Sequence, residues 1–330
     1  MRSRCVVAPK AQGETIRKKL SDDGVLRNDL KVTHDEEFVY IPVGGGGDTD
    51  AFDNLETTER DFEEIDRIGD YKEFLDLPND LSPLLPTSFD VVGDVYIIKL
   101  EDGLMPHSRD IAGAILKAHS NAKVVALDTG VEGEFRTRKL DIIGGEERTR
   151  TTHKEYGLSF DLDIAKVYFS PRLATERKRI AEMVRKGERI IDMFAGVGPF
   201  SLLIAKTAEP EIVYAIDKNP EAITYLIENI KINKIKNVAP MLGDAGELAP
   251  SLKKADRIIM NLPHSSLDFL DVGLGSVKPG GILHLYLISE YDEVDGLKDR
   301  LDQHATVNNV QEVHTYSPSQ CLYCLDLLTG

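Results

Sequence analysis

The first 47 residues combine two short apolar runs with one amphipathic segment. Residues 5–8 and 38–43 are apolar runs of strand length, and residues 14–20 place two apolar side chains four positions apart, as on one face of a helix. Four consecutive glycines, Gly44 to Gly47, then end the regular pattern. The pattern predicts a small N-terminal domain over residues 1–47.

The next stretch is dominated by charge. From Asp48 to Asp80 the sequence has 13 acidic and 3 basic residues, a net charge of −10. A glycine run followed by such an acidic stretch is typical of an exposed linker. We expect residues 48–80 to form a linker that contains a solvated helix over residues 58–75.

Residues 81–168 mix short apolar runs with one segment of helical spacing, which predicts a small α+β domain. The expected elements, after a proline-containing segment at 81–86, are strands or extended segments at 91–100, 123–127, 133–143 and 156–163 and a helix at 107–119.

Residues 169–330 change to a regular alternation of buried-type strands and helices. This alternation predicts an α/β fold with a doubly wound parallel sheet, and two final apolar runs predict a closing antiparallel hairpin. The expected strands are 189–194, 212–216, 238–242, 257–260, 282–287, 305–314 and 321–328, and the expected helices are 175–185, 199–206, 220–233 and 266–277, with a turn at 278–281.

The overall charge argues against one kind of partner. The 330 residues include 40 Lys and Arg and 56 Asp and Glu, a net charge of −16, so bulk positive charge does not attract nucleic acid. Most of this excess lies in residues 48–80, whereas residues 134–189 hold 14 basic and 10 acidic residues. A local basic site is therefore compatible with the composition.

The cysteines and the apolar runs indicate the compartment. No window approaches the roughly 18 apolar residues of a membrane span, and three cysteines are too few for a disulfide framework. We expect a cytoplasmic chain without a membrane partner. Cys321 and Cys324 have the spacing of half a zinc site or a redox pair, but they lie in a strand pattern without a second Cys/His pair nearby, so we expect no metal.

A glycine motif follows the first strand of the alternating region. It reads Asp192-Met-Phe194-Ala-Gly196-Val-Gly198-Pro-Phe, and glycines at such a position let the backbone turn tightly beside a ligand. Asp217, Asp244 and Asn261 follow the next three strands, at the same predicted sheet edge.

These side chains suit a nucleoside better than a dinucleotide. A carboxylate at Asp217 would accept hydrogen bonds from ribose hydroxyls, and Asp244 would accept one from an adenine amine. The third glycine of the dinucleotide fingerprint is replaced by Ser201. The pattern favours S-adenosylmethionine over NAD as the cofactor.

Motifs on the N-terminal side of the glycine motif indicate a more specific family. The segments Gly133-Glu-Phe-Arg136-Thr-Arg138, Thr152-His-Lys-Glu-Tyr-Gly157 and Tyr168-Phe-Ser-Pro-Arg172-Leu-Ala-Thr-Glu176-Arg177, with the glycine motif and Asn261-Leu-Pro263, resemble the archaeal and eukaryotic type of tRNA (guanine-37 N1)-methyltransferase. The resemblance runs from about residue 81 to the C-terminus, and residues 1–43 are similar to that family's N-terminal domain. It implies a class I methyltransferase (Rossmann-like) fold, S-adenosylmethionine as cofactor, tRNA as partner and a monomeric enzyme.

The resemblance also implies roles for individual residues. Guanine N1 carries a proton, so its methylation needs a base near N1 and a donor near O6. Glu176 is the expected base and Arg136 the expected O6 donor, while Asn261 and Pro263 hold the flipped guanine or the cofactor. The cofactor-binding set is Arg177, Asp192, Phe194, Gly196, Gly198, Asp217, Lys218, Asp244, Ala245, Asn261 and Pro263, and the substrate-binding set is Arg136, Arg138, Tyr168, Arg172 and Pro263.

Other interpretations stay open at this point. The same fold and cofactor serve a wyosine-pathway aminocarboxypropyl transferase or a dual-function methyltransferase of guanosine-37 and a wyosine intermediate. A non-catalytic tRNA-binding module could use the same fold as a scaffold. Glu176 and Arg179 have the i, i+3 spacing of an ordinary exposed helix pair, and Arg136 and Arg138 that of a solvated strand edge.

Overall fold

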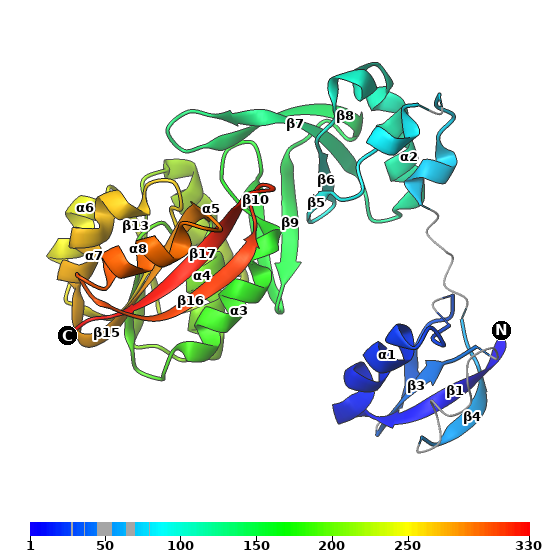
Figure 1. The fold of residues 1–330 in the computed structure, drawn as a ribbon, viewed down its shortest axis with the longest axis horizontal. Coiled ribbons are helices and arrows are strands. Elements are labelled where there is room, and N and C mark those ends of the chain that lie inside the picture. Colours follow the sequence, from blue (N-terminus) through cyan, green and yellow to red (C-terminus); the bar gives the residue numbers. More distant parts are fainter. Residues whose placement is uncertain (28, 36, 45–54, 64–69, 79) are drawn as a thin grey trace. The chain divides into compact units, whose positions relative to one another are not determined.

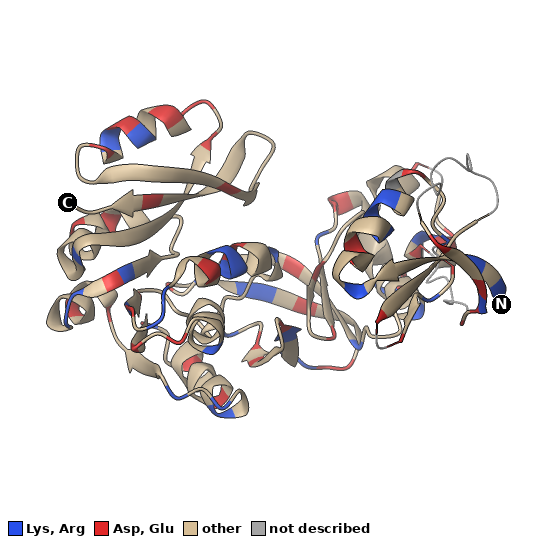
Figure 2. Cartoon of the chain, turned by 90° about the horizontal axis from the view of Figure 1, so that it is seen from below, with Lys and Arg blue, Asp and Glu red and all other residues tan. Residues whose placement is uncertain are grey.

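A computed structural model describes residues 1–27, 29–35, 37–44, 55–63, 70–78 and 80–330. The chain divides into two compact units, Met1–Asp70 and Tyr71–Gly330 (Figure 1). Lys and Arg residues are interspersed with Asp and Glu residues along the elements of both units (Figure 2). None of the helices within the described residues is both long and apolar enough to cross a membrane.

The first unit is an antiparallel sheet that packs on one helix. Its strands lie in the order β2-β3-β1-β4. Val6 and Ile41 of the sheet are buried together with Leu20 of the helix, as the apolar spacing predicts. The elements are β1 (Arg2–Pro9), the 3-10 helix η1 (Lys10–Gln12), α1 (Gly13–Asp22), β2 (Thr33–His34), β3 (Phe38–Pro42) and β4 (Thr57–Asp61).

The predicted helix over residues 58–75 was wrong. Thr57–Asp61 instead forms β4, which pairs with β1 so that Cys5 lies opposite Thr58, and Tyr71–Phe74 forms the 3-10 helix η3. Residues 64–69 lie outside the described residues, as do Gly45 to Gly47 of the glycine run. β4 is an edge strand, where charged side chains face solvent without disturbing the core. Its acidic sequence is therefore compatible with a strand.

The second unit begins with a four-stranded sheet in the order β5-β6-β7-β8 that packs on α2. The predicted single strand over 91–100 is a hairpin, because Gly93 turns the chain with φ of +59°. β9 was not predicted. The elements are η4 (Ser82–Leu84), β5 (Asp90–Val92), β6 (Val95–Ile98), η5 (Asp102–His107), α2 (Ser108–Ala118), β7 (Val124–Glu132), β8 (Thr137–Gly145), β9 (Arg150–Glu155) and β10 (Leu158–Asp163).

A seven-stranded sheet follows, in the order β13-β12-β11-β14-β15-β17-β16. The first five strands are parallel, and β17 is antiparallel to both β15 and β16, so the predicted doubly wound sheet with its closing hairpin is confirmed. The strands are β11 (Arg189–Asp192), β12 (Ile212–Asp217), β13 (Val238–Leu242), β14 (Ala255–Met260), β15 (Val277–Glu290), β16 (Thr306–Thr315) and β17 (Gln320–Leu328).

Helices cover both faces of this sheet (Figure 1). The helices α3 (Ala174–Met183), α4 (Pro199–Thr207) and α5 (Pro220–Ile232) contribute to one core, and α6 (Ala245–Leu248), α7 (Leu270–Ser276) and α8 (Val294–Leu301) contribute to the other. The 3-10 helices are η6 (Pro171–Leu173), η7 (Ala249–Ser251) and η8 (Ser266–Phe269). The helix α8 was not predicted, and the turn predicted at 278–281 lies inside β15, near an irregularity in its pairing with β14.

The chain runs from β11 outward to β13 on one side of the sheet and then returns to β14 on the other side. Such a switch point leaves a crevice at the carboxyl ends of the two central strands, where open α/β sheets bind ligands. Asp192 and Asn261 directly border this crevice, because they end or follow β11 and β14.

Asn229 of α5 joins the β9–β10 hairpin to the large sheet. Its Oδ1 accepts a hydrogen bond from Asp161 N at 2.7 Å, and its Nδ2 donates to Val197 O at 3.1 Å. Asn233 makes the equivalent contacts to Ser159 one turn later.

We expect Asn229→Ala to reduce the free energy of unfolding by about 2–4 kcal/mol, because it leaves buried backbone groups without partners. Urea unfolding measures this loss. Thr224→Ala, which removes an exposed hydroxyl from the same helix, is the matched control. Equal losses in the two variants would contradict the assigned role of Asn229.

Candidate active site

The turn between β11 and α4 requires glycine. Gly196 and Gly198 have φ values of +56° and +90°, and a Cβ atom at Gly198 would lie 2.4 Å from Leu226 Cδ1. Gly196 N donates a hydrogen bond to Asp217 Oδ2 at 2.7 Å, which ties the turn to the end of β12. The glycine motif therefore forms the tight turn that its sequence predicts.

Asp192 lies beneath this turn and is 1% exposed. Its Oδ2 accepts a hydrogen bond from Ser201 Oγ at 2.7 Å, while its buried Oδ1 has no hydrogen-bond partner among the residues that the structure describes. Burial raises the pKa of Asp192 to about 7. A buried carboxylate oxygen without a donor indicates that a positively charged or donating ligand group fits here.

Asp217 and Asp244 end the next two strands. Asp217 Oδ1 accepts from Asn219 N at 2.9 Å, and burial raises the pKa of its carboxyl. Asp244 Oδ1 caps α6 by accepting from Gly246 N at 2.8 Å, and buried Ala245 begins that helix. Each carboxylate keeps acceptor capacity beyond these bonds, because an ionised oxygen has two lone-pair directions.

Asn261, Leu262 and Pro263 follow β14 and are partly buried. Ser266 fixes the path of this loop, since its Oγ donates to Met260 O and accepts from Leu262 N.

Phe194, which follows β11, packs edge-on against Phe269, with ring centroids 5.1 Å apart.

The tip of the β7–β8 hairpin reaches this sheet edge. Glu134 Oε1 lies 2.6 Å from Nζ of Lys218, whose Nζ is also 3.8 Å from Asp244 Oδ2. The positive charge of Arg136, together with burial as the larger cause, lowers the pKa of His264. Arg136 therefore lies near the loop that follows β14.

Arg136 and Lys139, both on the β7–β8 hairpin, lack the ion pairs that most basic residues around them make within the described part of the chain. Most Lys and Arg side chains of residues 134–189 form ion pairs, such as those of Arg148 with Asp94 and Arg150 with Asp161. Within the described part of the chain, Arg136 has no ion pair or hydrogen-bonded side-chain partner, and it is exposed. Its guanidinium is available to a ligand.

Arg138 and Arg172 share Asp90. Arg138 binds Asp90 at 2.7 Å and Asp128 at 3.2 Å and is nearly buried, whereas Arg172 uses only its Nε, at 2.7 Å, and stays half-exposed. Burial alone would raise the pKa of Asp90, but these two guanidinium groups outweigh it and lower the pKa. Arg138 thus supports Asp90, and Arg172 keeps its terminal nitrogens free.

Tyr168 lies beside the glycine turn of residues 196–198. Its carbonyl oxygen is 3.7 Å from the position of a Cβ atom on Gly196, and its side chain is 52% exposed. A cavity of about 250 Å³ is lined by Asp90, Arg138 and Arg172. A larger cavity, of about 620 Å³, lies apart from the strand-end carboxylates, between Gly93 and Arg150 to Lys154.

Glu176 and Arg177 are both buried. Arg177 donates to Glu155 Oε1 at 2.8 Å and to Ser170 O at 3.1 Å, so it joins α3 to β9; its contact with the cofactor stays a prediction. Glu176 accepts from Arg179 through both oxygens, at 2.7 and 2.8 Å, and from Tyr286 at 2.7 Å. The interpretation of Glu176 and Arg179 as an exposed pair was wrong.

Sequence reasoning missed Tyr286 and Asp326 as neighbours of Glu176 and Arg179. The i, i+3 spacing was a signal for the pair within α3, but no local signal indicates contacts with strands more than 100 residues away. Cys321 and Cys324 were correctly placed in a strand, where they contribute to cores on opposite faces of the sheet. This separation argues against a redox pair.

Comparisons with known proteins agree with this arrangement. Residues 151–313 match the model of the TRM5/TYW2 methyltransferase domain, residues 71–149 that of the TYW2 N-terminal domain, and residues 5–46 that of the tRNA methyltransferase 5 N-terminal domain. The tRNA (guanine(37)-N(1))-methyltransferase Trm5b of Pyrococcus abyssi is 44% identical over 283 residues, covering 85% of this chain and 83% of the relative. The chain belongs to the TRM5/TYW2 methyltransferase family.

Two further TRM5/TYW2 members are informative. The solved complex of aTrm5 and tRNALeu aligns with a TM-score of 0.72 and 34% identity, covering 99% of both chains. The tRNA(Phe) (4-demethylwyosine(37)-C(7)) aminocarboxypropyltransferase of Methanocaldococcus jannaschii is 39% identical over 236 residues, 69% of this chain and 92% of the relative. The resemblance of the sequence motifs to the archaeal and eukaryotic type of tRNA (guanine-37 N1)-methyltransferase is therefore confirmed.

The buried state of Asp192 predicts a pH dependence of stability. Its pKa of about 7 in the folded chain lies above the ordinary value of 3.8, so the folded state retains a proton that the unfolded chain releases. Stability from this group is complete below about pH 4 and is lost as the pH rises through about 7.

We therefore expect the ligand-free Asp192→Asn variant to gain stability relative to the wild type as the pH rises from 5 to 8, by about 3 kcal/mol at most. Urea unfolding at each pH measures the difference. Asp268→Asn, at an exposed carboxylate, is the control. A stability difference that is the same at pH 5 and pH 8 would rule out the raised pKa.

Proposed function

We propose that this chain transfers the methyl group of S-adenosylmethionine to N1 of guanosine-37 in the anticodon loop of tRNA. One observation carries the proposal: the hairpin tip with the unpaired Arg136 is tied, through Glu134 and Lys218, to the edge that bears Asp217 and Asp244. This contact supports a site in which Arg136 is the O6 donor and the strand edge binds the nucleoside.

The strand-end residues fit S-adenosylmethionine. Asp217 suits the ribose hydroxyls, Asp244 and Ala245 suit the adenine, and the orphaned Oδ1 of Asp192 suits the positively charged end of the methionine moiety. When bound, the cofactor supplies an electrophilic methyl group on a sulfonium centre. Gly196 and Gly198 keep side chains out of the turn beside it.

Glu176 is the base in this proposal. Its Oε1 accepts two hydrogen bonds, from Arg179 and Tyr286, whereas its Oε2 accepts one. Oε2 is thus the oxygen with room for the N1 proton. As that proton moves to Glu176, the N1 lone pair forms the bond to the methyl carbon, and the electrons of the broken C–S bond remain on sulfur.

Arg136 and the Asn261 loop complete the site for the flipped base. The free guanidinium of Arg136 would donate to O6, where negative charge develops as N1 loses its proton. Asn261 and Pro263 would hold the guanine or the methionine end of the cofactor, and Tyr168 and Arg172 would shape the pocket. The monomeric state and the cytoplasmic location remain predictions from the sequence.

Aminocarboxypropyl transfer is the second candidate. The match of residues 71–149 to the TYW2 N-terminal domain and the M. jannaschii aminocarboxypropyltransferase favour it. The match of residues 5–46 to the tRNA methyltransferase 5 N-terminal domain favours methyl transfer. The presence of both Glu176 and Arg136 also favours methyl transfer. Aminocarboxypropyl transfer has a carbon atom as its acceptor and therefore needs no base to remove a proton from N1.

Product mapping tests the proposal. The purified full chain is incubated with methyl-labelled S-adenosylmethionine and an unmodified tRNA transcript that carries guanosine-37, and a transcript with adenosine-37 is the control. We expect 1-methylguanosine at position 37 after nuclease digestion and mass spectrometry. Absence of that product, or a mass that shows an aminocarboxypropyl group in place of the methyl group at position 37, would overturn the proposal.

We expect Arg136→Ala and Glu176→Gln each to reduce the turnover number by roughly 100-fold or more, because each removes a group that acts on the developing charge or proton. Binding of S-adenosylmethionine, measured by calorimetry, should persist. Lys139→Ala on the same hairpin and Glu182→Gln on the same helix are exposed controls. A variant with an unchanged turnover number would remove that residue from the active site.

A further inference from the structure

A buried chain of charged and polar groups extends from Glu176 across the sheet. It passes through three strands, because Arg179 of α3 contacts Asp326 of β17, which contacts His284 of β15, which contacts Arg257 of β14. The distances are 2.8 Å for Arg179 Nη1 to Asp326 Oδ2, 2.5 Å for His284 Nδ1 to Asp326 Oδ1, 2.6 Å for Arg257 Nη1 to His284 Nε2 and 3.1 Å for Arg257 Nε to Glu188 Oε2.

The tautomer of His284 follows from its partners. A guanidinium group only donates hydrogen bonds, so Nε2 of His284, in contact with Arg257, must be the acceptor. Nδ1 therefore carries the hydrogen and donates to Asp326. His284 is neutral in this arrangement, and its burial lowers its pKa in agreement.

Arg179 is consequently the cation nearest to two carboxylates. Asp326 is 1% exposed and receives hydrogen bonds from His284, from Asn309 at 3.0 Å and from Arg179. Of these donors, only Arg179 carries a charge. The same guanidinium makes the two-pronged contact with Glu176.

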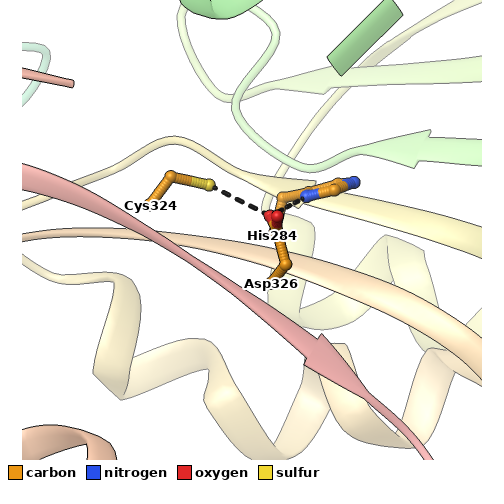
Figure 3. A group of neighbouring side chains, drawn as sticks. All are labelled: His284, Cys324 and Asp326. Atoms are coloured by element: carbon orange, nitrogen blue, oxygen red, sulfur yellow. Dashed lines mark hydrogen bonds and ion pairs between the residues drawn. The ribbon is translucent and has the colours of Figure 1, made fainter. Parts of the chain in front are cut away.

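A metal site does not explain this cluster. Ligand atoms of His284, Cys324 and Asp326 lie within 4.8 Å of one another, and Figure 3 shows the Cys324 and His284 side chains pointing toward the carboxylate of Asp326. However, Nδ1 of His284 holds a proton, and the guanidinium groups of Arg179 and Arg257 contact the cluster. Two guanidinium cations at this position repel a metal ion.

We propose that Arg179 is a positioning residue for methyl transfer: its two-pronged contact holds the Glu176 carboxylate with Oε2 toward the substrate, and Asp326 anchors Arg179 and shares its charge. This role rests on the proposed function. If Arg179 neutralised Glu176 alone, the carboxylate would take up the N1 proton less readily. Asp326 accepts hydrogen bonds from both terminal nitrogens of the same guanidinium, so the two carboxylates share the Arg179 charge.

Other groups that face Glu176 do not compete for the proton. The facing groups are Arg179 from α3, Tyr286 from β15, and Cys324 and Asp326 from β17, with His284 and Arg257 behind them. Burial raises the pKa values of the Tyr286 phenol and the Cys324 thiol, so both stay protonated near neutral pH. Burial opposes ionisation of Asp326, but His284 and Arg179 outweigh it and lower its pKa.

The pH profile of the single-turnover rate tests this role, measured from pH 5 to 9 with saturating S-adenosylmethionine and tRNA. We expect Arg179→Gln to lower the maximal rate about tenfold or more and to move the acid limb to higher pH, because the carboxyl loses its cation. Arg179→Lys should restore part of the rate. Asp326→Asn should move the acid limb in the opposite direction, to lower pH.

Controls separate this role from a structural one. Lys178→Gln changes an exposed cation on the same helix and should leave the rate and the pH profile unchanged. The tRNA concentration for half-maximal rate should change little in the Arg179 variants. Each variant is checked for cofactor binding and thermal unfolding, and if Asp326→Asn does not fold, the comparison of Arg179→Lys with Arg179→Gln decides.

Failure of the Arg179 role and failure of the proposed function give different results. Folded, cofactor-binding Arg179 variants with the wild-type rate and pH profile would overturn the positioning role, and so would a loss of stability alone. If the wild type forms no 1-methylguanosine, the proposed function itself fails. If the wild type is active and the variants behave like it, only the role of Arg179 fails.

Discussion

Glu155 and Arg177 are both almost fully buried, and each is the main partner of the other. The pair illustrates a constraint that recurs through the second unit: a buried charge is costly unless a group of opposite charge and hydrogen-bond donors surround it. Asp90 with Arg138, and Asp326 with Arg179, meet the same requirement. These pairs join β5 to β8, β9 to α3, and α3 to β17.

Asp192 departs from this constraint. It is as deeply buried as the paired carboxylates, but one of its oxygens lacks a donor and burial raises its pKa to about 7. It lies where the glycine turn leaves backbone open to a ligand. The paired charges therefore define the framework, and the unpaired oxygen marks the place where a ligand completes it.

The paired charges also position the elements that carry Arg136 and Arg172. Arg177 attaches β9 to α3, and Asp90 attaches β5 to β8 and to Arg172 beside the Tyr168 segment. These contacts join the strands of the small sheet and of the β9–β10 hairpin to the segment of residues 168–183 that packs on the large sheet. The long β7–β8 hairpin can then carry Arg136 to the strand edge, where Glu134 meets Lys218.

The sequence by itself determined the α/β sheet and its cofactor edge, because period-two and period-3.6 apolar patterns and glycine turns are local signals. Asp192, Asp217, Asp244 and Asn261 were predictable as neighbours, since parallel strands end at one edge. Local signals failed for β4, whose charged edge position imitated a solvated helix, and for the Gly93 hairpin.

Only the tertiary structure decided the environment of Glu176. The spacing of Glu176 and Arg179 was visible in the sequence, but the burial of the pair depends on Tyr286 and Asp326, which are 110 and 147 residues away from their respective partners. The free energy of a buried ion pair is set by desolvation and by all surrounding donors, and these are brought together only when the sheet folds.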